Sequence, residues 1–309
     1  MGKIAFIFPG QGAQHMDMAK EFYETCRESR KVFEEASQAA GFSIEDICFQ
    51  DDGRLNQTQY TQPALFTANC AILKAVEEAG IQADMTAGLS LGEYCALMAA
   101  GVLDFSDAIR VVCSRGRYME EEVPENQGSM AAILSRKELP MEEICGQVEG
   151  TVVVANYNCP GQRVISGERE AVEEAAEKLL EAGASRVVPL KVSGPFHSPM
   201  LKGAGEKLYD RLEAVPIAEP SIPFVSNVTA REASEPEQIR SLLGQQVCSP
   251  VYWQQSIEYM IASGADTFVE IGPGKTLSNL MKKIDRSVKV YNVETAADLE
   301  TLKKELQAG

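Results

Sequence analysis

Histidine is scarce in this chain of 309 residues, which contains only His15 and His197. The eight cysteines include no C-x-x-C pair. A zinc site built from histidine and cysteine clusters has almost no residues to use, and we expect neither a metal nor another cofactor. Any reaction step that needs an imidazole base must use one of the two histidines.

Basic residues are the minority among the charged residues. There are 29 lysines and arginines and 45 acidic residues, which gives a net charge of −16 at pH 7. Because a nucleic-acid backbone attracts a basic surface, this balance argues against nucleic acid as the main partner.

Long hydrophobic runs are also absent. No run approaches the roughly 18 residues that a membrane-spanning helix needs, and the N-terminal apolar stretch is interrupted at residues 9–12 (PGQG). We therefore expect no membrane segment and no signal peptide. Without an export signal the cysteines should be reduced thiols, which predicts a cytoplasmic protein.

Strand and helix patterns alternate along most of the chain. The apolar run at 3–8 ends in Pro-Gly, as a buried strand that enters a loop would. Helical patterns at 17–26, 31–40 and 62–79 precede a strand at 84–89, and helices at 92–100 and 105–122 follow. Beyond 195, helices at 199–212, 251–263 and 276–283 alternate with strands at 223–226, 267–271 and 288–290, before a C-terminal helix. This order predicts an α/β fold with a parallel sheet covered on both faces.

The pattern changes between about 125 and 195. The order there is strand (129–134), helix (137–148), strand (151–155), strand (163–166), helix (168–182) and strand (186–192). This βαββαβ order is that of a ferredoxin-like unit. We therefore expect a core domain formed by residues 1–124 and 196–309, with an inserted ferredoxin-like subdomain at 125–195.

Residues 88–92 (GLSLG) lie between a predicted strand and a predicted helix, the context of a nucleophile elbow. The glycines permit a sharp turn that would expose the Ser90 hydroxyl at the carboxyl edge of the sheet. The Leu91 N–H and the helix N-terminus would then point toward an oxyanion. The alternative is an ordinary strand-to-helix turn that happens to contain serine.

A serine hydroxyl needs a base within hydrogen-bond reach to act as a nucleophile at neutral pH. His197 lies in a loop between Pro195 and Pro199, which is a rigid placement for a catalytic side chain. His15 follows a Gly-rich turn and is the other candidate. Either histidine could be structural, and spacing favours His197 only slightly.

Two further Gly-rich turns follow strands. Residues 9–14 (PGQGAQ) are either a site of close ligand approach or a tight turn, but they are no dinucleotide fingerprint because His15 stands where its last glycine would be. Residues 272–276 (GPGKT) lack the first P-loop glycine, since position 269 is Val269. We interpret this second segment as a turn with a helix start.

Taken together, several segments resemble the malonyl-CoA:acyl carrier protein transacylases of bacterial fatty acid synthesis. They occur in the family's order and span nearly the whole chain: 8–14 (FPGQGAQ), 61–64 (TQPA), 88–94 (GLSLGEY), 115–119 (RGRYM), 155–162 (ANYNCPGQ), 194–198 (GPFHS) and 270–275 (EIGPGK). The resemblance implies a hydrolase-like parallel-sheet core with a ferredoxin-like insertion, which agrees with the division predicted above.

The resemblance also implies the chemistry. Ser90 would take the malonyl group from malonyl-CoA as an ester, and His197 would act as its base in a Ser-His dyad. Acyl carrier protein would then accept the group in a ping-pong transfer. Gln246 aligns with the glutamine whose backbone carbonyl supports the histidine, and the backbone N–H groups of Gln11 and Leu91 would form the oxyanion hole.

The substrate-binding residues follow from the same alignment. In this alignment, Arg115 corresponds to the arginine that binds the malonyl carboxylate. The role fits its chemistry, since a guanidinium binds a carboxylate bidentately. Arg117 is the alternative, but residues two apart on a helix face different directions. Gln11, Gln62 and Phe196 would also bind substrate, and Phe196 resembles the malonyl-specific members.

This chain departs from the family at Leu89, where most members carry histidine. That position is not the base, so catalysis should survive. Contacts that the usual histidine makes near the acyl pocket are lost, and the strictness of acyl selection is left open.

Acyl carrier protein is itself acidic, so an enzyme with a charge of −16 needs a local basic surface to bind it. Between 275 and 289 the chain has five basic residues and one acidic residue. By the resemblance, the docking residues would be Lys282, Lys283 and Arg186, and the local excess of positive charge adds Lys275. A merely solvated helix face is the alternative for each of them.

Two other functions fit parts of the sequence. A hydrolase, either an esterase or a thioesterase, could use the same serine elbow, although Arg115 and the lack of a triad acid argue against it. A carrier-binding module with an inactive site is disfavoured because Ser90 and His197 are both present.

Overall fold

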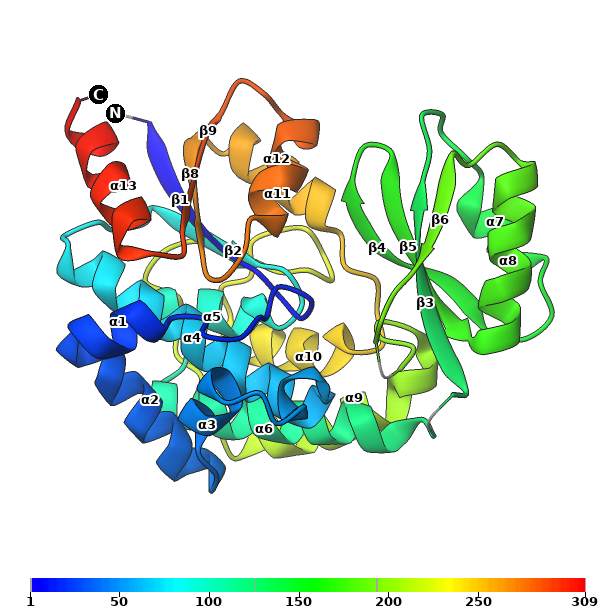
Figure 1. Cartoon of the computed structure of the whole chain (residues 1–309). Coiled ribbons are helices and arrows are strands. Elements are labelled where there is room, and N and C mark those ends of the chain that lie inside the picture. Colours follow the sequence, from blue (N-terminus) through cyan, green and yellow to red (C-terminus); the bar gives the residue numbers. More distant parts are fainter. Residues whose placement is uncertain (1, 125, 193, 309) are drawn as a thin grey trace.

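The computed structural model describes residues 2–124, 126–192 and 194–308. It contains a parallel five-stranded sheet with flanking helices and a separate antiparallel four-stranded sheet (Figure 1). The predicted fold class is therefore confirmed. The predicted boundary residue Glu125 lies outside the described residues, so the limits of the inserted subdomain stay a prediction.

The five-stranded sheet has the order β7-β2-β1-β8-β9, and all its neighbouring strands are parallel. Its strands are β1 (Lys3–Phe8), β2 (Met85–Gly88), β7 (Phe224–Val225), β8 (Ala265–Ile271) and β9 (Lys289–Val293). Side chains alternate between the two faces of a strand. Phe6 and Phe8 of β1 therefore pack into the larger apolar cluster on one face, whereas Ala5 and Ile7 pack into a second cluster on the other.

Helices cover both faces of this sheet. The larger cluster is built with helices α1 (Lys20–Thr25), α2 (Arg27–Ala40), α3 (Ile44–Phe49), α4 (Thr58–Glu78), α5 (Gly92–Ala99), α6 (Phe105–Glu122), α9 (Lys202–Glu213), α10 (Pro236–Gln246) and α13 (Ala296–Ala308). Helices α11 (Trp253–Ala262) and α12 (Thr276–Ile284) complete the opposite cluster. Short 3₁₀ turns occupy Arg54–Asn56 and Pro199–Leu201.

The smaller unit, drawn in green in Figure 1, has the βαββαβ order that the sequence predicts. It consists of β3 (Gly128–Leu134), α7 (Met141–Gly146), β4 (Val152–Cys159), β5 (Gln162–Glu168), α8 (Arg169–Glu181) and β6 (Arg186–Pro189). The antiparallel sheet has the order β4-β5-β3-β6, and α7 and α8 cover one of its faces. Strand β4 joins the core through a hydrogen bond of 2.9 Å from the Tyr157 N–H to the Val251 carbonyl.

Several elements differ from the predicted ones for local reasons. Helix α1 begins at Lys20 instead of residue 17, because Asp17 and Ala19 have left-handed backbone angles that a helix does not permit. Helix α7 begins at Met141 instead of residue 137, directly after Pro140, whose ring disfavours a helical residue before it. Helices α3 and α10 have no counterpart among the predicted elements.

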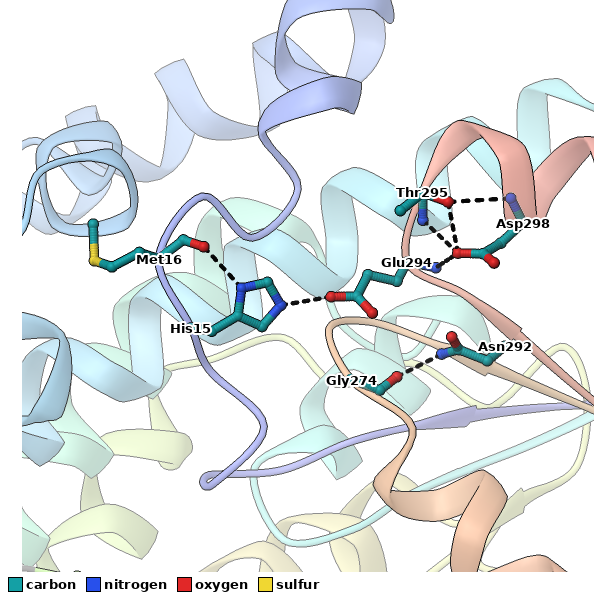
Figure 2. A network of polar contacts seen from close by, with 7 residues as sticks. All are labelled: His15, Met16, Gly274, Asn292, Glu294, Thr295 and Asp298. Carbon is teal, nitrogen blue, oxygen red and sulfur yellow. Dashed lines mark hydrogen bonds and ion pairs between the residues drawn. The ribbon is translucent and has the colours of Figure 1, made fainter.

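The loop after β1 is tied to the C-terminal part of the chain by His15 (Figure 2). One ring nitrogen, Nδ1, lies 2.8 Å from the Met16 carbonyl, and the other, Nε2, lies 2.5 Å from Oε1 of Glu294. The same corner is held by Asn292, which donates to the Gly274 carbonyl at 2.7 Å, and by Asp298, which accepts from Thr295. Since both ring nitrogens face acceptors, the protonated imidazolium fits this place best.

We predict that His15 stabilises the fold in a pH-dependent manner. Partial burial opposes its charge, but hydrogen bonds to Met16 and Glu294 leave the pKa of His15 raised above 6.5. The stabilisation should be complete below the pKa of the unfolded chain and should disappear as the pH rises through the higher folded pKa. His15→Gln should lower the melting temperature by roughly 1 °C at pH 6 and have no effect at pH 9.

The matched control is Lys303→Gln, which removes an exposed ion pair with Glu300 and is measured at pH 6 and pH 9. Its effect on the melting temperature should be the same at both. If His15→Gln lowers the melting temperature equally at pH 6 and pH 9, the ionic role of His15 is contradicted.

Candidate active site

Three neighbouring strands of the parallel sheet end at the site. Phe8 of β1 pairs with Gly88 of β2, and β7 lies on the other side of β2. The loop at 9–12, the turn at 89–91 and the segment at 226–227 therefore leave the same carboxyl edge, which is where α/β sheets commonly bind their ligands.

Ser90 occupies a sharp turn between β2 and α5. Its φ angle is 54°, a left-handed conformation that a non-glycine residue rarely adopts. Close packing on both sides makes glycine necessary at Gly88 and Gly92. A Cβ atom on Gly88 would lie 2.0 Å from the Gly92 backbone, and one on Gly92 would lie 2.1 Å from the Phe8 carbonyl oxygen. The sequence therefore forms the strained turn of a nucleophile elbow.

His197 is the histidine that lies beside Ser90. Its Nε2 lies 2.7 Å from the Ser90 Oγ, and its Nδ1 lies 2.8 Å from the backbone carbonyl of Gln246. A carbonyl only accepts, so Nδ1 carries the proton and Nε2 is free to accept the serine proton. His197 also has a left-handed φ of 59° and is buried.

Burial, assisted by the positive charge of Arg115, lowers the pKa of His197 to about 4. The imidazole is therefore neutral at pH 7, which is the form that can accept a proton from Ser90.

Arg115 extends from α6 to the same point and is only 1% exposed. Its Nη2 donates to the Ser90 Oγ at 3.2 Å and to the Gln246 Oε1 at 2.9 Å, and its Nη1 donates to the Gln62 Oε1 at 2.8 Å. These acceptors are all uncharged, and Nε has no partner among the described residues. Arg117, two positions further along the helix, is exposed and lies over the Tyr118 ring.

Burial lowers the pKa of Arg115, but a guanidinium stays charged in proteins. A cation that contacts no carboxylate among the described residues and lies beside the Ser90 hydroxyl is suited to receive an anionic group of a substrate.

Gln11 and Leu91 lie on the two turns that adjoin at the sheet edge. Within the described ranges, neither of their backbone N–H groups donates to another protein group. The Gln11 side chain donates to Thr58 at 3.1 Å. The two N–H groups are therefore available to an oxyanion, as an oxyanion hole requires.

Asn227 contacts the turn at Ser90, and the sequence did not indicate this. Its Oδ1 accepts from the Ser90 N–H at 2.7 Å, and its Nδ2 donates to the Gly88 carbonyl at 2.6 Å, so it fixes the turn from both sides. Its position two residues after the short strand β7, at the carboxyl edge of a parallel sheet, is the signal that could have indicated it.

A cavity between the core and the smaller unit leads to Ser90. Its walls include residues from both units: Gln11, Gln62, Leu89, Ser90, Arg115, Met119, Met130, Asn156, Asn158, Gln162, Val164, Leu190, Val192, Phe196, His197, Thr276 and Leu280. Leu89 packs beside the apolar cluster that includes Leu280. The cavity wall at Leu89 is therefore apolar.

The four expected docking residues are all exposed. Lys283 Nζ lies 3.4 Å from the Oε1 of Gln162, which lines the cavity. Arg186 and Gln162 both pair with Leu134, from opposite sides of β3, so Arg186 lies two strands away from Gln162 at the same end of the sheet. Lys282 and Lys275 belong to α12 and the residue before it.

A protein carboxylate binds the N–H groups at the start of the helix that follows the segment at 272–276. The carboxylate of Glu270 accepts from the Leu277 N–H at 2.9 Å and from the Ser278 N–H at 2.8 Å. These two N–H groups are occupied, which agrees with the interpretation as a turn and helix start.

No group of three or more histidine, cysteine, aspartate or glutamate side chains in the described ranges could hold a metal ion. Among the helices of these ranges, none has both the length and the apolar character that crossing a membrane requires.

Comparison with known proteins places the chain in a family. Residues 5–308 match the acyl transferase domain family. The chain is 45% identical over 313 residues to the malonyl CoA-acyl carrier protein transacylase of Bacillus subtilis, and the alignment covers 99% of each protein.

Solved structures agree with this assignment. The malonyl CoA-acyl carrier protein transacylase of Clostridium perfringens has a TM-score of 0.95 and 45% identity, with 99% of this chain and 98% of that chain covered. A malonyl-transacylase solved in complex with its type II PKS acyl-carrier protein has a TM-score of 0.95 and 38% identity, with 98% and 99% covered. The chain therefore belongs to the acyl transferase domain family, among the malonyl CoA-acyl carrier protein transacylases.

Proposed function

We propose that this chain transfers malonyl groups from malonyl-CoA to acyl carrier protein through a malonyl ester on Ser90, and so supplies fatty acid chain elongation. The observation that carries the mechanism is the position of the Ser90 Oγ, 2.7 Å from His197 Nε2 and 3.2 Å from Arg115 Nη2. The proposed base and the proposed carboxylate-binding cation thus both lie within hydrogen-bond distance of the nucleophilic oxygen. The free state of all eight cysteines agrees with a cytoplasmic setting for the reaction.

In the first half-reaction, the Ser90 Oγ attacks the thioester carbonyl carbon while its proton passes to His197 Nε2. The bond between carbon and sulfur breaks, and His197 returns the proton to the coenzyme A thiolate. The Gln246 carbonyl holds His197 in the required tautomer and stabilises the imidazolium that forms.

In the second half-reaction, His197 takes the proton of the pantetheine thiol of acyl carrier protein. The thiolate attacks the malonyl ester, and the Ser90 Oγ leaves and regains the proton. Both tetrahedral intermediates would place their oxyanion between the N–H groups of Gln11 and Leu91. Loss of one such donor typically costs about 3 kcal/mol of transition-state stabilisation.

Arg115 would bind the malonyl carboxylate and so distinguish malonyl from acetyl groups. When malonyl enters, its guanidinium gains a charged acceptor beside the uncharged oxygens of Gln62 and Gln246. Neutralisation of this charge also removes part of the effect that lowers the pKa of His197, so substrate binding strengthens the base. Phe196 and Met119 line the cavity and would exclude water from the acyl group.

The chain should form a covalent intermediate at Ser90. Incubation with malonyl-CoA alone should add one malonyl group to each chain, detected as an increase in intact mass, and Ser90→Ala should abolish it. Because a backbone carbonyl stands where a triad would have an acid, the malonyl ester should persist until the thiol of acyl carrier protein attacks it. An absent adduct on the wild type would favour a carrier-binding module, and rapid steady release of free malonate would favour a hydrolase.

Removal of the Arg115 charge should change the selection between acyl groups more than the rate of acyl transfer itself. We expect Arg115→Ala to reduce acylation of Ser90 by malonyl-CoA roughly 100-fold, the usual effect of losing one partner of a buried ion pair. Acylation by acetyl-CoA should be retained or increase. Arg117→Ala is the matched control and should leave both rates unchanged, since Arg117 is exposed. An equal loss for both acyl groups would mean that the carboxylate is held elsewhere.

Reversing the charge of the basic surface should affect only the use of acyl carrier protein, the second substrate. We expect Lys282→Glu with Lys283→Glu to raise the KM for acyl carrier protein about tenfold, since docking depends on local charge complementarity. Loading from malonyl-CoA should not change. The same change of charge on α13, Lys303→Glu with Lys304→Glu, is the control. A carrier KM that stays the same in the first variant would refute the docking surface.

A further inference from the structure

Glu93 is a buried carboxylate that the mechanism does not use. It lies in the first turn of α5, three residues after Ser90, and is 1% exposed. Its Oε1 accepts from the Asn227 backbone N–H at 2.9 Å, and its Oε2 accepts from the side-chain Nε2 of Gln246. A buried carboxylate is costly to the fold unless its hydrogen bonds compensate, so its presence calls for a role.

Gln246, the partner of Glu93, contacts all three residues of the proposed site. Its backbone carbonyl accepts from His197, its side-chain Nε2 donates to the Ser90 backbone carbonyl at 3.0 Å, and its Oε1 accepts from Arg115 at 2.9 Å. An amide can rotate by half a turn and exchange its oxygen and nitrogen. In the reverse orientation its NH₂ group would face the Arg115 guanidinium, which only donates.

We propose that Glu93 is a positioning residue that fixes the orientation of the Gln246 amide, so that Gln246 presents its oxygen to Arg115 and holds Arg115 at the acyl group. This inference rests on the proposed role of Arg115 in binding the malonyl carboxylate. Glu93 touches neither substrate nor the reacting atoms in the proposed mechanism. It acts through Gln246.

Only a carboxylate meets the requirements of this position. One side of Glu93 faces a backbone N–H that cannot turn away, and the other faces the Gln246 NH₂ group. A glutamine at this place would turn its oxygen to the Asn227 N–H and its own NH₂ to Gln246. Gln246 would then have to reverse, bringing its NH₂ against Arg115 and its oxygen against the Ser90 carbonyl.

Glu93→Gln therefore tests the inference with almost no change in shape. We expect the KM of malonyl-CoA in Ser90 acylation to rise at least tenfold, and acylation by acetyl-CoA to change less than threefold. The control is Glu270→Gln, a second buried carboxylate that accepts two backbone N–H groups. It should lower the melting temperature without changing the ratio of malonyl to acetyl acylation.

The wild type offers a second measurement that does not depend on folding of the variant. Burial raises the pKa of Glu93 to about 7 against the opposing effect of its hydrogen bonds. Arg115 of α6 and Tyr94 of α5 are the charged or titratable groups that act on it, while its contacts on Asn227, Ser226 and Gln246 are uncharged. Protonation replaces an acceptor by a donor, so the ratio of malonyl to acetyl acylation should fall between pH 8 and pH 6.

The outcomes separate the two proposals. If wild-type Ser90 forms no malonyl adduct, the proposed function fails. If the adduct forms, but the ratio is the same in Glu93→Gln and in the wild type, the positioning role of Glu93 is overturned. A ratio that falls equally in Glu270→Gln would also overturn it, because general loosening of the fold would then suffice. If Glu93→Gln does not fold, a wild-type ratio that stays constant from pH 8 to pH 6 overturns it.

Discussion

The proposed active site depends on burying one guanidinium that contacts no carboxylate in the part of the chain that the structure describes. Removing an ion from water costs several kcal/mol in a protein interior, and the cost is tolerable only when hydrogen bonds replace the lost water. For Arg115 those hydrogen bonds come from the side-chain oxygens of Gln62 and Gln246 and from Ser90. Direct pairing with a protein carboxylate would satisfy the charge fully and leave nothing for a substrate. Under the proposed mechanism, this incomplete satisfaction is the basis of selection for malonyl groups.

The fold holds the proposed nucleophile rigidly and brings the proposed base from another part of the chain. Ser90 is fixed by two buried strands, two glycines and Asn227, whereas His197 follows the smaller unit and reaches the site from a separate loop. Both residues have left-handed backbone angles. Such strain persists only when the surroundings impose it, and here buried contacts to Gln246, Asn227 and Val247 do so.

Much of the architecture could be predicted because the signals were local. Alternation of strands and helices predicts the parallel sheet, and the βαββαβ order predicts the smaller unit. The elbow at Ser90 could be located because glycines at fixed spacing between a strand and a helix have a steric cause. The roles proposed for Arg115 and Gln246 came from resemblance, since spacing alone does not place residues 25 and 156 positions from Ser90 beside it.

What the sequence could not predict depends on contacts between distant segments. Asn227 follows a strand of two residues, too short to give a clear pattern. Glu93 lies in the segment 88–94, yet its contact with Gln246 is visible only where α5 meets α10. The net charge of −16 described the chain as a whole and did not reveal that the exposed Lys283 lies beside Gln162 of the cavity wall.

Competition for Ser90 tests the central claim most directly. The wild-type protein is mixed with equal amounts of malonyl-CoA, methylmalonyl-CoA and acetyl-CoA, and the first adducts on Ser90 are measured by intact mass. If the buried Arg115 charge selects the acyl group, the two adducts that carry a carboxylate should greatly outnumber the acetyl adduct. Acetyl and malonyl adducts in equal amounts would contradict the account.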